Sequence, residues 1–198
     1  GKQLFTSLGP DFVREIVGMG EDVFLDLKYH DIPNTVAKAG LAAASLGVKV
    51  FNVHASGGRK MMEAVRAELN KLENPPMVLA VTVLTSMGAE DLAETGITVT
   101  PGQQVARLAK LAKDSGMDGV VASPLEIEII RSVCGEDFKI LTPGIRPASS
   151  SSDDQKRIAT PSAALKAGSD YLVIGRPVTG APDRKKAFLD ILAEIKAS

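Results

Sequence analysis

The chain has 198 residues, 44% of them hydrophobic and 24% charged, which is the composition of an ordinary soluble protein with one sizeable core. Its formal net charge of −1 gives no broad positive field, so nucleic acid and anionic membrane surfaces are not expected partners. No apolar run approaches the roughly 18 residues of a membrane-spanning helix, and the lone Cys134 excludes an internal disulfide and fits a reducing cytoplasm.

Short β-rich apolar runs alternate along the chain with longer segments of helical period. The predicted strands are 23–27, 48–53, 78–84, 119–122, 139–141 and 171–174. The predicted helices are 11–17, 35–46, 59–72, 103–113, 125–133, 162–167 and 184–196. Asn34 is the predicted N-cap of the second of these helices, and Gly47 is expected to end it.

The strands are apolar on successive residues, which is typical of a parallel sheet covered by helices. An open doubly wound sheet and a (β/α)8 TIM barrel are the two architectures that compete. Polar residues come just after almost every strand, and a barrel gathers such strand ends at one mouth, so the barrel is favoured. Six strands cannot close it. We therefore expect a single TIM-barrel domain over 1–198 that lacks its first strand and most of its second, with roughly 30–45 further residues at the amino terminus of the native polypeptide.

The densest group of charged residues follows the first predicted strand. Alternation along a strand places Asp26 and Lys28 on the same side, and Asp31 follows in the loop. Two carboxylates flanking an ammonium would keep the lysine charged, as a proton donor with a fixed direction. The alternative is a solvated cluster of charges at a strand end.

Two glycine–arginine loops follow the last two predicted strands, where TIM barrels often bind phosphate. They are TPGIRP at 142–147, which carries Arg146, and GRP at 175–177, which carries Gly175 and Arg176. Glycine permits close backbone approach and arginine offers a bidentate charged fork, while Gln155 between the loops could add an amide donor. The alternative is a pair of turn glycines beside surface arginines.

Other polar residues at strand ends leave two interpretations open. His54 could be a ligand or a base, although a histidine satisfied in a hydrogen-bond network at a strand end is favoured. Thr85 and Ser86 end the third predicted strand and could meet the polar edge of a heterocycle, or could serve a turn or a helix cap. With two histidines and one cysteine, no zinc constellation is present, and Cys134 is expected to be a small buried thiol.

Five motifs, in this order, resemble the bacterial orotidine 5′-phosphate decarboxylase family: DLKYHDIPNT (26–35), NVHASGG (52–58), VTVLTSM (81–87), LTPGIRP (141–147) and YLVIGRPVTGAPD (171–183). The DxKxxD pattern alone is shared with other barrels that act on phosphorylated sugars. The IPNT extension and the LTPGIRP loop are more discriminating. The resemblance covers almost the whole chain.

The resemblance implies decarboxylation of orotidine 5′-phosphate to uridine 5′-phosphate in pyrimidine biosynthesis, without metal or cofactor. By that similarity, Lys28 protonates the carbanion left at C6, and Asp26 lies beside the departing carboxylate. Asp31, accompanied by Thr35, reaches the active site of the neighbouring subunit in a homodimer. The implied substrate contacts are Thr85 and Ser86 at the pyrimidine, and Arg146, Gln155, Gly175 and Arg176 at the phosphate end.

The resemblance is incomplete at the front of the chain. The family's first strand carries an aspartate that holds the ribose, and its second strand carries a lysine that completes the charge array. Neither residue has a match in this sequence. Lys2 is not assigned the role of the missing lysine. One alternative is a related barrel enzyme that acts on phosphorylated sugars, in which Asp26 and Asp31 would be magnesium ligands. Another is a nucleotide-binding remnant without catalysis.

Overall fold

The computed structural model describes residues 1–147 and 159–196. The chain forms two compact units, Gly1–Thr82 with Leu108–Val120 and Val83–Arg107 with Val121–Ser198. The described helices include none that is long and apolar enough to cross a membrane.

In the described part of the chain, six strands form a sheet in the same order in which they follow one another along the sequence. They are β1 (Phe24–Tyr29), β2 (Val50–His54), β3 (Met77–Val81), β4 (Gly119–Val121), β5 (Lys139–Thr142) and β6 (Tyr171–Leu172). The pairs β1–β2, β2–β3 and β5–β6 are parallel. A doubly wound sheet reverses its strand order at a switch point, whereas a TIM barrel adds each strand beside the previous one. The order confirms a parallel α/β sheet of the TIM-barrel type and disfavours the doubly wound alternative.

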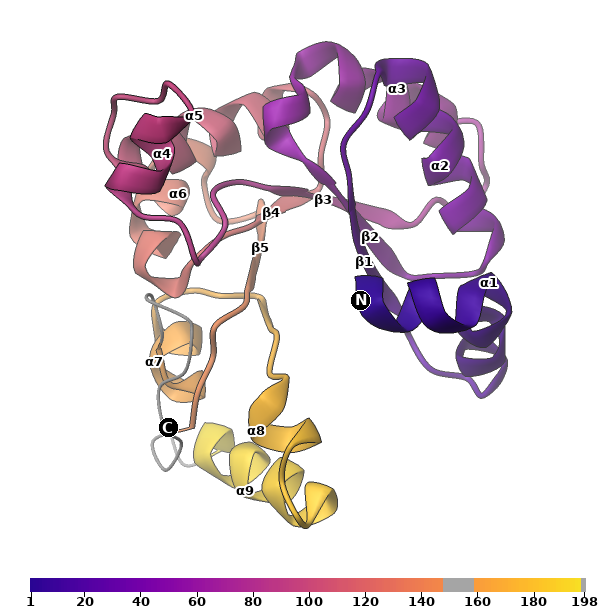
Figure 1. Cartoon of the computed structure of the whole chain (residues 1–198), viewed down its shortest axis with the longest axis vertical. Helices are drawn as coiled ribbons and strands as arrows, with labels where there is room; N and C mark the ends of the chain where they lie inside the picture. Colours follow the sequence, from indigo (N-terminus) through magenta and orange to yellow (C-terminus); the bar gives the residue numbers. More distant parts are fainter. Residues whose placement is uncertain (148–158, 197–198) are drawn as a thin grey trace. The chain divides into compact units, whose positions relative to one another are not determined.

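Helices follow the strands, as the sequence predicts (Figure 1). They are α1 (Lys2–Gly18), α2 (Pro33–Ser45), α3 (Arg59–Leu69), α4 (Ala89–Glu94), α5 (Pro101–Asp114), α6 (Ile127–Cys134), α7 (Pro161–Lys166), α8 (Arg176–Thr179) and α9 (Arg184–Lys196), with short 3-10 turns at Ala55–Gly57 and Pro124–Glu126. All seven predicted helices have a counterpart among them. The sequence did not indicate α4 and α8, which are too short to show a helical period.

Two local predictions are corrected, and a third is confirmed. Helix α2 begins at Pro33 with Ile32 as its N-cap, so Asn34 lies in the first turn and does not cap it. Proline is favoured at this first position because its missing N–H would have no helical partner there. Strand β3 ends at Val81, three residues before the predicted Leu84. Gly47 does follow the end of α2, with a φ of 78° that favours glycine.

The core of the first unit lies between β1–β3 and the helices α2 and α3, which run side by side (Figure 1). Phe51 and Val53 of β2 and Met61 of α3 have no exposed surface. Gly40 of α2 lies against the Phe51 ring, where an added Cβ would come within 3.2 Å. Each large apolar side chain buried in this way contributes about 1.5–3 kcal/mol of transfer free energy.

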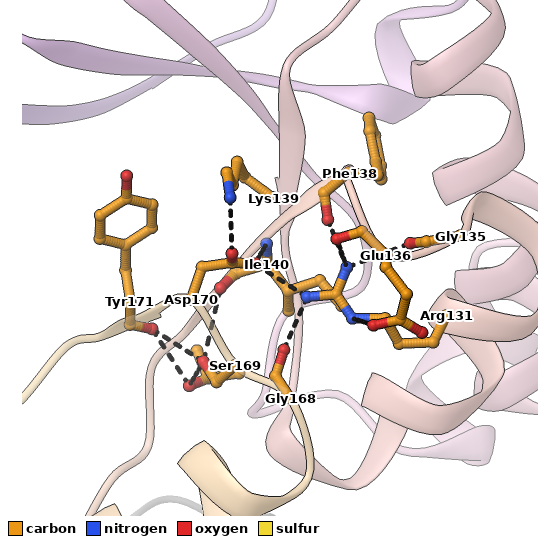
Figure 2. Close-up of polar contacts among 11 residues, drawn as sticks. Arg131, Gly135, Glu136, Phe138, Lys139, Ile140, Gly168, Ser169, Asp170 and Tyr171 are labelled. Carbon is orange, nitrogen blue, oxygen red and sulfur yellow. Dashed lines mark hydrogen bonds and ion pairs between the residues drawn. The ribbon is translucent and has the colours of Figure 1, made fainter.

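In the second unit, Arg131 of α6 ties the helix to the amino ends of β5 and β6 (Figure 2). The guanidinium donates hydrogen bonds to the backbone carbonyls of Gly135, Glu136, Phe138 and Gly168 and to the carboxylate of Asp170. Asp170 also accepts bonds from Lys139 and from the backbone N–H of Ile140. Burial raises the pKa of Asp170, but these donors outweigh it and hold the pKa below its usual value.

The first unit repeats this arrangement. Arg66 of α3 donates to the carbonyl of Gly116 and to Asp118, both at 2.6 Å, and Asp118 accepts the backbone N–H of Val78 at 2.7 Å. In each unit, therefore, an arginine on a helix donates hydrogen bonds to the glycine and the aspartate of a Gly-x-Asp segment that comes just before a strand. The aspartate also accepts a backbone N–H from the neighbouring strand that comes earlier in the chain. Such bonds at the amino ends of the strands stabilise the fold and leave the carboxyl ends for chemistry.

Candidate functional site

The backbone of β1 is irregular where its charged residues lie. Leu25 pairs with Phe51 and Tyr29 with Val53, so four steps along β1 face two steps along β2. This bulge contains Lys28, whose φ of 54° is the only left-handed value at a non-glycine residue among those the structure describes. A bulge bends a strand and redirects side chains, often beside an active site.

The bulge brings the ammonium of Lys28 onto the carboxylate of Asp26. The Lys28 Nζ lies 2.7 Å from Oδ1 and 2.9 Å from Oδ2 of Asp26, and both side chains are half-buried. The sequence predicted that these two side chains share one side of the strand, and they do. The reason is the bulge rather than the regular alternation on which the prediction relied.

Asn52 of β2 completes this group, and sequence reasoning did not identify it. Its side chain is fully buried; its Oδ1 accepts the backbone N–H of Lys28 at 2.8 Å, and its Nδ2 donates to Asp26 at 2.7 Å. One signal was available, since a carboxamide stands inside an otherwise apolar strand run, two residues before His54. A buried amide requires partners for both ends, so its presence indicates a polar network.

The electrostatics of this group keep Asp26 ionised. Burial raises the pKa of its carboxyl, but hydrogen bonds from Lys28 and Asn52, together with the positive charge of Lys28, outweigh the burial and lower the pKa below 3.8. At neutral pH the pair is a carboxylate and an ammonium with fixed orientation. Such a pair can deliver a proton in one direction and can stabilise or repel charge that develops beside it.

Asp31 does not join this group within one chain. Its carboxylate accepts the backbone N–H of Ile32 at 2.6 Å, and among the described contacts it makes no ion pair with Lys28. Asp31, Ile32 and Thr35 are exposed at the start of α2. Within one chain Lys28 is therefore paired with Asp26 and not with Asp31, and flanking by a second carboxylate stays a prediction.

His54 lies at the end of β2 against His30, with 5.4 Å between the ring centroids. None of the hydrogen bonds of the described residues involves its ring, so the interpretation as a histidine satisfied in a network stays a prediction. Burial, reinforced by His30 and by the charges of Lys2 and Lys28, lowers the pKa of His54 to about 4. The ring is neutral at physiological pH.

The second unit carries the remaining predicted residues. Thr85, half-buried, and Ser86, exposed, lie in a turn beyond the end of β3 rather than at the strand end itself. The turn is closed by a bond from the Met87 N–H to the Leu84 carbonyl. The turn interpretation holds for their backbone, and contact with a heterocycle stays a prediction.

The two glycine–arginine loops differ in their exposure. Arg146 is only 6% exposed and its Nη1 donates to the carbonyl of Ile145, so it is not a surface arginine. Gly144 has a φ of 78° and is a turn glycine. Arg176 is exposed and is the first residue of α8, preceded by Gly175. Gln155 lies outside the described residues.

The side chains of the described residues do not form a recognisable metal site. In the described ranges, no three histidine, cysteine, aspartate or glutamate side chains are grouped as metal ligands would be. Both oxygens of Asp26 already accept hydrogen bonds from Lys28, and one of them also accepts from Asn52. Cys134 is buried, as expected.

A parallel sheet in chain order, with a lysine–aspartate pair toward the carboxyl end of a strand, defines an α/β enzyme of the TIM-barrel type. Residues 1–191 match the model of the Orotidine 5′-phosphate decarboxylase / HUMPS family, and the chain belongs to this family.

Two relatives are named orotidine 5′-phosphate decarboxylase. The protein from Saccharophagus degradans is 60% identical over 98% of this chain and 82% of its own length. The protein from Idiomarina loihiensis is 55% identical over 98% of this chain and 84% of its own length. The crystal structure of orotidine 5′-phosphate decarboxylase from Lactobacillus acidophilus, 41% identical, superposes with a TM-score of 0.82 over 94% of this chain and 81% of that one.

Proposed function

We propose that this chain decarboxylates orotidine 5′-phosphate to uridine 5′-phosphate, a step of pyrimidine biosynthesis, without metal or cofactor. The observation that carries the proposal is the Lys28 ammonium held 2.7 Å from Asp26 toward the carboxyl end of β1. The names of the two curated relatives support the same substrate. In this proposal the described strands belong to one TIM-barrel domain of a cytoplasmic enzyme.

Lys28 is the proton donor of the proposed reaction. The bond between C6 of the pyrimidine and its carboxylate breaks, carbon dioxide leaves, and the electron pair stays on C6. The Lys28 Nζ gives a proton to C6 and later regains one from solvent. Because no electron sink is invoked, the acceleration depends on charges placed in advance where charge develops. The ion pair with Asp26 keeps the ammonium both protonated and oriented.

Asp26 lies beside the departing carboxylate in this proposal. Its lowered pKa means that it is ionised when substrate binds, so its charge repels the substrate carboxylate, and this repulsion is relieved when the carboxylate leaves as neutral carbon dioxide and the electron pair stays on C6. Asp31 and Thr35 act in the site of a partner subunit, which makes the enzyme a homodimer with shared sites. Their exposure at the start of α2, beside the exposed Ile32, suits contact with a second copy.

Six further residues are the proposed contacts of the nucleotide. Thr85 and Ser86 meet the pyrimidine, and the phosphate end is held by Arg146, Gln155, Gly175 and Arg176. Beside Gly175 a Cβ would meet no heavy atom within 4 Å apart from its chain neighbours, so the space next to its backbone is open for a ligand. Binding energy from the remote phosphate can be used to close the site around the ring.

The magnesium-dependent alternative needs Asp26 as a ligand. Hydrogen bonds from Lys28 and Asn52 already occupy the Asp26 carboxylate, and a nearby ammonium opposes a cation. We therefore expect the decarboxylation rate of the wild-type chain to be the same with and without EDTA. Loss of activity on chelation would favour the magnesium alternative.

Lys28→Ala tests the proposed proton donor. We expect it to remove nearly all decarboxylation of orotidine 5′-phosphate while uridine 5′-phosphate still binds, because the proton transfer belongs to the transition state. The matched control is Lys49→Ala, which removes an exposed ammonium at the other end of β2, 4.0 Å from Asp22, and should leave turnover unchanged. Retention of about a tenth of the wild-type kcat by Lys28→Ala would refute the role.

Arg176→Ala tests the phosphate end. Affinity for uridine 5′-phosphate should fall, and some kcat should fall with it, because the phosphate contact also drives closure. Calorimetric titration with uridine and with uridine 5′-phosphate separates the two: only the phosphorylated ligand should weaken. Equal weakening of both ligands would contradict a phosphate contact.

A further inference from the structure

The bulge in β1 leaves Lys28 in a conformation that the strand alone does not support. A lysine at φ 54° is disfavoured by its own Cβ, and such residues persist only when their surroundings hold them. The bulge also removes the regular ladder partner of the Lys28 N–H, since four steps of β1 face two steps of β2 at this point. Something other than sheet pairing must therefore satisfy that N–H.

Asn52 supplies the missing partner. Its Oδ1 takes the Lys28 N–H at 2.8 Å, and its Nδ2 binds at 2.7 Å the same Asp26 oxygen that receives the Lys28 ammonium. The orientation of the amide is fixed by chemistry, because an N–H can only donate and a carboxylate can only accept. With no exposed surface, the amide has no water with which to exchange these bonds.

We propose that Asn52 is a positioning residue for the decarboxylation: it holds the backbone of Lys28 in the left-handed conformation and aims Asp26, so that the ammonium stands at one fixed place. This inference rests on the proposed function and adds a residue that does not itself touch the reacting atoms. Two bonds from one rigid amide join the backbone of the proton donor to the carboxylate that orients its side chain. Loss of the amide frees both at once.

The effect should fall on turnover rather than on nucleotide binding. Displacement of a catalytic group by about 1 Å costs roughly 100-fold in rate. Asn52→Leu keeps the buried volume but makes neither bond, so we expect kcat to fall about 100-fold while the dissociation constant of uridine 5′-phosphate changes less than about threefold. Asn52→Ser, whose hydroxyl makes one of the two bonds at a time, should lie between wild type and Asn52→Leu.

The matched control is Val53→Ala. Val53 is the next residue of β2, equally buried but on the opposite face, so its truncation loosens the core without touching Lys28 or Asp26. Val53→Ala should lower the melting temperature while kcat stays within about twofold of wild type. A kcat for Asn52→Leu within threefold of wild type, or kcat losses that follow melting temperature across the Asn52 and Val53 variants, would overturn the inference.

A crystal structure of Asn52→Leu tests the positioning role independently of activity, and Asn52→Ser replaces it if the first variant folds poorly. We expect Lys28 to lose its positive φ or its Nζ to lose contact with Asp26. A variant in which Lys28 keeps both its positive φ and its contact with Asp26 would overturn the positioning role. Failure of the proposed function is a different result, namely a wild-type chain that does not convert orotidine 5′-phosphate.

Discussion

Replacing Arg131 by methionine tests how much the arginine-centred bonds of the second unit stabilise the fold. The variant keeps an unbranched apolar side chain and loses the five hydrogen bonds of the guanidinium. The Arg131 side chain is only 12% exposed, so water replaces few of these bonds. Asp170 keeps Lys139 at 2.9 Å and the Ile140 N–H at 2.8 Å, and is not left alone.

The expected loss in the free energy of unfolding is about 3 kcal/mol, the lower end of what breaking a buried ion pair costs, because Asp170 retains two donors. For a chain of this size that corresponds to a fall of roughly 6–12 °C in melting temperature. Urea unfolding followed by circular dichroism measures it.

The control for this variant is Lys186→Met, which breaks an exposed pair with Asp190 and should leave the melting temperature almost unchanged. If Arg131→Met were no less stable than Lys186→Met, the bonds in Figure 2 would contribute nothing net, and the reasoning from burial would be wrong.

Two further predictions concern pH and assembly. Because the pKa of folded His54 is about 4, below its usual 6.5, the unfolded chain takes up the proton first as pH falls. Stability should therefore fall by about 1–2 kcal/mol between pH 6.5 and 4 for this half-buried ring, and His54→Gln should remove that part of the slope in urea titrations at each pH. If Asp31 acts in the partner's site, a mixed dimer of one Lys28→Ala and one Asp31→Asn subunit contains one site in which both residues are intact. Half of the dimers formed by random mixing are of this kind, so mixing should restore about a quarter of wild-type activity. Mixing that restores no activity would contradict shared sites.

The sheet was predictable because its signals are long and redundant. Each predicted strand overlaps an observed one, since β-rich apolar runs bounded by helical segments leave little ambiguity. Residues 82–84 were assigned to the third strand because the apolar residues Val83 and Leu84 follow Val81, where the sheet pairing stops. Helix α4 was missed because only Leu92 of its six residues is buried, too little for a detectable period.

The candidate site was only partly predictable. The Asp26–Lys28 pair followed from spacing, but the bulge that joins them depends on pairing with β2, which local sequence does not encode. Asn52 was overlooked in favour of His54, because a histidine near a strand end suggests chemistry more readily than an amide does. The bonds of Asn52 reach across 24 and 26 positions of sequence, and no local pattern gives such partners.

Within the first unit, stability and strain lie at opposite ends of the strands. Arg66 and Asp118 bond the amino ends of β3 and β4, whereas the left-handed Lys28 and Asn52 lie toward the carboxyl ends of β1 and β2. Strain at a reactive group persists only if the rest of the fold offsets it. Arg66→Met should therefore lower the free energy of unfolding by about 2 kcal/mol and leave kcat unchanged, whereas Asn52→Leu should lower kcat about 100-fold. If kcat and the free energy of unfolding fell in the same proportion in both variants, the conformation of Lys28 would depend on the global stability of the fold and not on the local hydrogen bonds of Asn52.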